Sequence, residues 1–223
     1  MSPALRRLCQ GTGAAALLLA GGLLLLPALG LRFGGGPGAP GGPGGPPVAE
    51  GAPAELPDLG PAPAFVLTDQ DGEPFDSAAL AGRPWVVDFV FTRCPAICPV
   101  LSRSMARVQR ATEAVAGRTR LVSISVDPEH DTPEVLRAYA GRHGADTARW
   151  SFLTGDRQET WSLIREGFKL VVAENPSDPA NPIAHTPKLV LVDGDGRVRG
   201  YYDGTIPDEV EALTRDLTRL AAG

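Results

Sequence analysis

The chain has 223 residues and a formal net charge of −5, from 21 Lys and Arg against 26 Asp and Glu. An acidic chain without a clustered basic excess lacks the electrostatic footprint of a nucleic-acid-binding protein, so we expect no nucleic-acid partner. Its 3 cysteines are too few for a disulfide-stapled scaffold, which favours a redox or metal-binding role for them.

Residues 1–33 have the pattern of a signal or anchor segment. Two arginines precede an apolar run from Gly11 to Leu31, close to the ~20 residues that cross a bilayer. One interpretation is an uncleaved anchor with its N-terminus in the cytoplasm, as the positive-inside rule predicts. The other is a signal peptide cleaved near Ala28-Leu29-Gly30, a small-x-small site. We favour the membrane anchor because the apolar run continues past Pro27; in both cases we expect an exported domain outside the inner membrane, on its periplasmic or extracytoplasmic side.

Residues 34–60 are mostly Gly, Pro and Ala. A segment of this composition buries too little apolar surface to offset the entropy of ordering its backbone. We therefore predict a disordered Gly/Pro-rich linker over 34–60 and a folded domain over 61–223.

The domain alternates between predicted strands and helices. Trp85 to Phe91 is a nearly continuous apolar run, typical of a central strand covered on both faces. Asp131-Thr132-Pro133-Glu134 has the residues of a helix start, and Asp193-Gly194-Asp195-Gly196 is a hairpin turn. In chain order the pattern predicts a strand at 65–68, a strand at 85–91, a helix at 100–115, a strand at 121–126, a helix at 131–144, a helix at 157–167, an apolar stretch at 169–172, strands at 188–192 and 197–202, and a helix at 207–220. This order is that of an α/β, thioredoxin-like sandwich.

Cys94 and Cys98 lie between the predicted central strand and the next helix. Ligands of open α/β sheets bind outside the carboxyl ends of strands. If the helix begins at these residues, the two thiols share one face of it, and the helix N-terminus lowers their pKa. Two convergent thiolates form a soft site that suits Cu(I) and also Zn(II). The plainer alternative is a pair of buried structural cysteines.

A site with two sulfur ligands calls for a third ligand, and the sequence has 3 histidines. His185 precedes a buried strand, in a loop that faces the cysteine segment in a thioredoxin-like fold. His130 lies in a polar loop before a capped helix, and His143 lies near a helix C-terminus, where it can face water. We favour His185 as the ligand.

Three segments carry a resemblance to a known family. They are Phe91-Thr92-x-Cys94-Pro95-x-x-Cys98-Pro99, then Ser125-Val126-Asp127-Pro128-x-x-Asp131-Thr132-Pro133-Glu134, and His185-Thr186 before the strand that ends in Asp193-Gly194-Asp195-Gly196. From about Pro61 to its end, the chain resembles the SCO/SenC family of copper-assembly proteins of cytochrome c oxidase.

The resemblance implies that copper binds to Cys94, Cys98 and His185, and that Cys94 and Cys98 can form a redox disulfide. It also implies a copper metallochaperone, rather than an enzyme with assigned catalytic residues. Its expected partners are the copper-site subunit of cytochrome c oxidase, whose cysteines such proteins are proposed to reduce, together with copper-donor proteins and the membrane through the N-terminal segment.

Three alternatives stay open. A thiol-disulfide oxidoreductase that acts on protein cysteines needs Cys94 and Cys98 but neither metal nor His185. It is disfavoured because thioredoxins use Cys-x-x-Cys, one residue shorter than this spacing. A peroxiredoxin-like peroxidase places its threonine one residue further from the cysteine than Thr92 lies from Cys94. A copper sensor or store has the same residues as a delivery protein, and the sequence does not separate the two.

Overall fold

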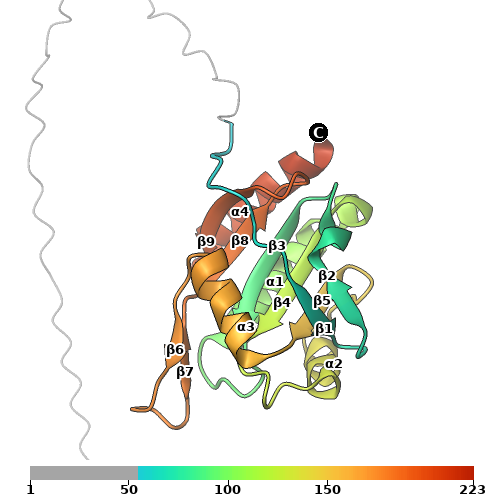
Figure 1. The fold of residues 1–223 in the computed structure, drawn as a ribbon. Helices are drawn as coiled ribbons and strands as arrows, with labels where there is room; N and C mark the ends of the chain where they lie inside the picture. Colours follow the sequence, from blue (N-terminus) through green and yellow to red (C-terminus); the bar gives the residue numbers. More distant parts are fainter. Residues whose placement is uncertain (1–54) are drawn as a thin grey trace, which may run out of the picture. The chain divides into compact units, whose positions relative to one another are not determined.

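The computed structural model describes residues 55–223, and the predicted anchor and nearly all of the predicted linker lie outside the described residues. These residues form the predicted α/β sandwich of thioredoxin-like type (Figure 1). The strands are β1 Val66–Asp69, β2 Pro74–Asp76, β3 Trp85–Val90, β4 Arg120–Ser125, β5 Trp150–Thr154, β6 Val172–Glu174, β7 Ile183–His185, β8 Lys188–Val192 and β9 Val198–Asp203. The helices are α1 Cys98–Ala111, α2 Pro133–Arg142, α3 Arg157–Ser162 and α4 Pro207–Ala222, with 3₁₀ turns η1 Ser77–Leu80 and η2 Glu113–Arg118 and a π-helical turn η3 Leu163–Gly167.

The main sheet is seven-stranded, in the order β2-β1-β5-β4-β3-β8-β9. β3 pairs in parallel with β4 and antiparallel with β8. Every residue of β3 is buried, as its continuous apolar run predicts for a strand covered on both faces. β6 and β7 form a separate two-stranded sheet, which extends from the main body as a hairpin (Figure 1).

Helices cover both faces of this sheet (Figure 1). On the face below α3, the ring of Phe168 contacts the rings of Trp85 and Phe89, with centroids 6.4 and 5.4 Å apart. The opposite face is covered by α1 and α2, which are joined by a 2.7 Å hydrogen bond between the hydroxyls of Ser102 and Tyr139. Successive residues of β3 alternate between these two faces, so Asp88 points to the α1 side.

Three strands, β2, β5 and β7, were not predicted from the sequence. β5, Trp-Ser-Phe-Leu-Thr, pairs in parallel with β4 but is only 5 residues long and is buried at four of them, so it lacks an alternating pattern. β7 has 3 residues, too few for any periodicity. The first helix begins at Cys98 and not at residue 100, and it ends at Ala111, after which the chain continues as η2.

The segment from Leu56 to Pro61 runs along β9. The N–H of Leu59 donates to the carbonyl of Val198 at 2.9 Å, and the N–H of Val198 donates to the carbonyl of Gly60 at 2.9 Å. Asp58 forms an ion pair with Arg197 at 2.9 Å. Residues 56–60, which the sequence analysis assigned to the linker, therefore contact the folded domain. Within residues 55–223, no helix is both long and apolar enough to span a bilayer.

A carboxyl group is buried inside the sheet. Asp88 has 0% exposure, and its Oδ1 accepts a hydrogen bond from the hydroxyl of Ser123 at 2.5 Å. That hydroxyl also accepts from the indole N–H of Trp150 at 2.9 Å, whereas Oδ2 of Asp88 has no hydrogen-bond partner. Burial in this apolar layer raises the pKa of Asp88 to about 7.

We expect a chain that begins at residue 62 to be less stable than one that begins at residue 55. The shorter chain loses the hydrogen bonds to Val198 and the ion pair of Asp58. At about 0.5–1.5 kcal/mol for each hydrogen bond, the free energy of unfolding should fall by about 1–3 kcal/mol. Urea denaturation of both fragments measures the difference, and equal midpoints would show that the segment contributes nothing.

We expect Asp88→Asn to stabilise the protein above about pH 4 by an amount that grows up to pH 7. Because the pKa of Asp88 is higher in the folded state than in the unfolded state, the folded wild type holds the extra proton in this window. Its stability therefore falls as pH rises, by at most ~1.4 kcal/mol per pH unit, and the neutral amide removes this loss. Urea denaturation across pH, with the exposed Asp195→Asn as control, measures the difference; parallel profiles for wild type and Asp88→Asn would contradict the prediction.

Candidate metal centre

Both motif cysteines lie at the carboxyl end of β3, where the sequence predicts them. The strand ends at Val90, the N–H of Cys94 donates to the carbonyl of Phe91 at 3.2 Å in a turn, and α1 begins at Cys98. Cys94 is therefore in the loop before the helix and does not share a helix face with Cys98. Cys94 is 5% exposed and Cys98 0%, and both are free thiols.

His185 contacts the deeper of the two cysteines. Its Nε2 lies 3.3 Å from Sγ of Cys98, and its Nδ1 lies 3.2 Å from the carbonyl oxygen of Thr186. A carbonyl only accepts hydrogen bonds, so Nδ1 carries the proton, and Nε2 of the neutral ring has its lone pair directed at the sulfur. The ring also packs edge-on against Phe91, with centroids 5.9 Å apart.

The sheet explains why residues 87 positions apart in the sequence meet here. β3 and β8 are antiparallel neighbours, with Val87 opposite Val190. In an antiparallel pair, the end of one strand lies beside the start of the other. The segment that follows β3 therefore lies beside the residues that precede β8, which include His185.

The pKa values of the two thiols are shifted in opposite directions. The pKa of Cys94 is well below its usual range, chiefly because the Cys98 thiol donates a hydrogen bond to it, with further contributions from His185 and from the backbone N–H groups of Cys98 and Ala96. The same hydrogen bond and burial raise the pKa of Cys98, although the N–H of Phe91 donates to its Sγ at 3.4 Å. Without metal, the pair therefore holds one thiolate, at Cys94, and one thiol, at Cys98.

A buried carboxylate fixes the backbone just before Cys94. Asp131, with 0% exposure, accepts hydrogen bonds from the N–H and the hydroxyl of Thr92, at 3.1 and 2.6 Å, and from the hydroxyl of Ser125 at 2.6 Å. Next to it, Arg93 forms a 2.6 Å ion pair with Asp127. The loop after β4 thus holds the loop after β3 through charge-assisted hydrogen bonds.

Within residues 55–223, neither of the other two histidines forms a hydrogen bond or ring contact with a cysteine. His130 lies 3.0 Å from Asp131 through Nδ1, and its side chain is 45% exposed. The ring of His143 packs against Tyr139, with centroids 4.4 Å apart. Of the three histidines, His185 is thus the one that contacts a cysteine in this part of the chain.

Two polar residues near the thiols were not singled out from the sequence. The amide oxygen of Asn181 lies 3.8 Å from Sγ of Cys94, and it comes from the loop of the β6–β7 hairpin. Asp88 is the other, six residues before Cys94. Asp88 could have been noticed in the sequence, because it is an acid within the apolar run of β3. Asn181 could not, because its position depends on a loop conformation that no sequence pattern predicts.

The sulfur and nitrogen atoms of this site fit a soft metal, but they are not already arranged around one. Among residues 55–223, no three His, Cys, Asp or Glu side chains have the spacing needed to hold a metal ion. The Cys98 thiol, which donates to the Cys94 thiolate, also lies 3.3 Å from Nε2 of His185, so its proton must leave before a metal binds these three atoms.

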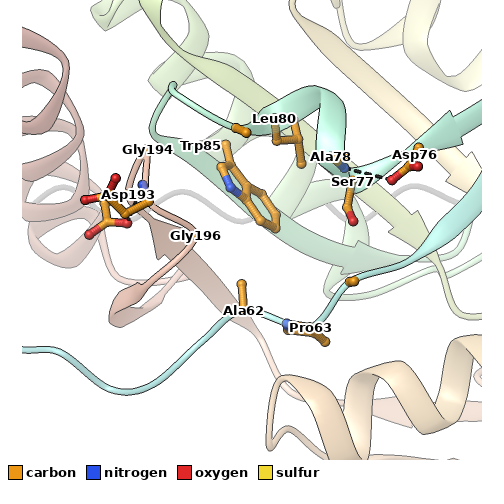
Figure 2. Close-up of a pocket in the computed structure, with 13 residues that line it drawn as sticks. Ala62, Pro63, Asp76, Ser77, Ala78, Leu80, Trp85, Asp193, Gly194 and Gly196 are labelled. Carbon is orange, nitrogen blue, oxygen red and sulfur yellow. Dashed lines mark hydrogen bonds between the residues drawn. The ribbon is translucent and has the colours of Figure 1, made fainter.

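A cleft of about 450 Å³ lies elsewhere in the domain (Figure 2). Its walls include Pro63, Trp85 and the turn at Asp193 and Gly194. Trp85 is the first residue of β3, and the cysteines follow the last, so this cleft is at the opposite edge of the sheet from the thiols.

The family model described as SCO1/SenC matches residues 56–222 of this chain. A solved SCO1/SenC family lipoprotein from Bacillus anthracis is 33% identical, with a TM-score of 0.67 over 72% of this chain and 95% of that chain. ScoI from Bradyrhizobium japonicum, solved with copper bound, is 29% identical, with a TM-score of 0.62 over 72% of this chain and 99% of that chain.

A third solved structure is BsSco, which is described as having a disulfide switch and as a member of the Sco family of cytochrome c oxidase assembly proteins. It is 28% identical to this chain, with a TM-score of 0.66 over 75% of this chain and 98% of that chain.

We expect Thr92→Val to destabilise the protein by about 1.5–3 kcal/mol, because it removes a hydrogen bond to a buried carboxylate without changing the side-chain shape. Thr205→Val is the matched control, since its hydroxyl donates to Asp203 at an exposed position, where the loss should be within about 0.5 kcal/mol. Urea denaturation measures both variants. Equal effects would show that the Thr92–Asp131 hydrogen bond does not hold the loop.

Proposed function

The chain belongs to the SCO1/SenC family, and we propose that it is a copper metallochaperone that binds copper through Cys94, Cys98 and His185. The observation that carries the proposal is the 3.3 Å contact between Sγ of Cys98 and Nε2 of His185, with the Cys94 thiolate hydrogen-bonded to the same thiol. The copper-bound ScoI of Bradyrhizobium japonicum, similar in sequence and fold, supports the choice of metal.

The donor set explains why copper suits the site. Thiolates are soft ligands that favour Cu(I), and imidazole also suits Cu(II), so this set can bind either oxidation state. The hydrogen bond from His185 to the Thr186 carbonyl orients the ring and leaves Nε2 free to bind the metal, as outer-shell partners of histidine ligands commonly do. Copper binding would require the proton of Cys98 to leave, so that both sulfurs and Nε2 are available as ligands.

We assign copper the role of cargo for the copper site of cytochrome c oxidase. The description of BsSco as a member of a family of oxidase assembly proteins supports this partner. Pro95 and Ala96, between the two cysteines, are exposed, so the copper-site subunit or a copper-donor protein can approach Cys94 from this side. Copper then passes between proteins by exchange of thiolate ligands.

A second candidate function uses the same cysteines without metal. The lowered pKa of Cys94 gives a thiolate nucleophile beside a thiol, which is the arrangement that thiol-disulfide exchange needs. We propose that Cys94 and Cys98 form a redox disulfide, in keeping with the disulfide switch described for BsSco. In this role the dithiol reduces a disulfide between the cysteines of the oxidase subunit to two thiols and itself becomes a disulfide.

We propose that the domain is exported and stays tethered outside the inner membrane. Residues 1–33 carry the predicted anchor or signal segment, and residues 34–60 the predicted linker. The description of a similar protein as a lipoprotein supports a membrane-associated location. A tether confines the domain near a membrane-bound partner and so raises its effective concentration there.

We expect the reduced wild-type protein to bind one copper ion. Cys94→Ser and Cys98→Ser should each lose tight Cu(I) binding, because one soft ligand is replaced by a hard hydroxyl. His185→Ala should mainly lower the affinity for Cu(II), since two thiolates can hold Cu(I) without an imidazole. Competition with Cu(I)- and Cu(II)-selective chelators measures both affinities.

His143→Ala is the matched control, because this histidine does not contact the cysteines and should leave both affinities unchanged. Wild-type affinity for both oxidation states in either cysteine variant would contradict the ligand assignment. Disulfide exchange with a thiol substrate that persists in His185→Ala while copper binding is absent from the wild type would favour the second candidate function.

A further inference from the structure

Asp88 is a buried acid that the copper site does not use as a ligand. It lies at 0% exposure in the middle of β3, and one of its two carboxyl oxygens has no partner. None of the ion pairs formed by residues 55–223 includes it. Burying a carboxyl group without a counter-charge costs stability, which raises the question of what the group contributes.

The position of Asp88 couples it to the cysteine pair. It faces the α1 side of the sheet and precedes Phe91 by three residues of extended chain, about 10 Å. The N–H of Phe91 donates to Sγ of Cys98 at 3.4 Å, so the acid lies on the order of 10 Å from this thiol. The electrostatic effects agree, since the charge of Asp88 raises the pKa of Cys98, and a protonated His185 would lower the pKa of Asp88.

The other titratable groups on this side of the sheet do not neutralise Asp88. They are Tyr139 of α2, a phenol whose pKa is raised mainly by burial, and Cys94, whose thiolate has the same sign as the carboxylate. The neutral His185 ring carries no charge in the tautomer that Thr186 fixes. The field of an ionised Asp88 therefore acts on the site without local compensation.

The net charge of the site depends on the oxidation state of copper. Two thiolates and a neutral imidazole carry two negative charges, so the complex with Cu(I) has a net charge of minus one and the complex with Cu(II) is neutral. A nearby carboxylate repels the Cu(I) complex and leaves the neutral Cu(II) complex nearly unaffected. We propose that Asp88 sets the oxidation-state preference of the copper site, shifting it toward Cu(II) by its negative charge.

This inference rests on the proposed copper site, and its size follows from Coulomb's law. At ~10 Å and an effective dielectric constant of ~20, the repulsion corresponds to about a tenfold change in relative affinity. Asp88 does not touch the metal, so its removal should change the ratio of the two affinities while leaving the ligands in place.

The test uses the full chain in detergent, and compares wild type with Asp88→Asn and Asp88→Leu. Dissociation constants for Cu(I) and Cu(II) come from competition with selective chelators at about pH 8, above the pKa of Asp88. We expect the preference for Cu(II) over Cu(I) to fall about tenfold in both variants, because both remove the charge. Asp195→Asn, which removes an exposed charge at the opposite edge of the sheet, should keep the wild-type ratio.

The remaining outcomes are distinguishable. An unchanged ratio in a folded Asp88 variant overturns the inference, and so does an equal loss of both affinities, which would mean a purely structural role. If one of the two Asp88 variants fails to fold, the ratio of affinities measured for the other variant tests the inference. If the wild type binds neither Cu(I) nor Cu(II), the proposed function fails and this inference fails with it.

Discussion

The contact between Cys98 and His185 is the interaction on which this account depends. It joins the loop after β3 to the residues before β8, and it exists because these two strands are antiparallel neighbours in one sheet. The same junction places Cys94 at the N-terminus of α1, where backbone N–H groups and the Cys98 thiol stabilise its thiolate. A sulfur pair and an imidazole thus meet at an edge of the sheet that the core already holds rigid.

Two buried carboxyl groups support this junction in opposite ways. Asp131 accepts hydrogen bonds from Thr92, Ser125 and His130, so its charge is compensated and it fixes the loop before Cys94. Asp88 accepts a single hydrogen bond, from Ser123, and its charge is not compensated. Asp131 therefore fixes the conformation of the loop, whereas the charge of Asp88 acts on the thiols through the protein interior.

The sequence predicts the parts of the fold whose patterns are long and local. The apolar run of β3, the capped start of α2 and the Asp-Gly-Asp-Gly hairpin each have a clear pattern, and each is found in the structure. β5 was missed because a short strand buried on both faces has no alternation, although it is central to the sheet. Cys94 and Cys98 were recognised from their spacing, and His185 from the strand that follows it.

The features that the sequence did not predict depend on contacts between distant segments. The pairing of Leu59 with Val198 extends the domain into a region whose composition is typical of a linker. Asn181 reaches Cys94 because the loop of the β6–β7 hairpin lies beside the cysteine loop.

X-ray absorption at the copper edge is the most direct test of the central claim, that this junction binds copper through its two sulfurs and its imidazole. The reduced protein loaded with copper should show sulfur neighbours at the distance of a thiolate ligand, together with the multiple scattering of an imidazole ring. A copper spectrum without sulfur neighbours, or one that is the same after Cys94 and Cys98 are both replaced by serine, would contradict the account.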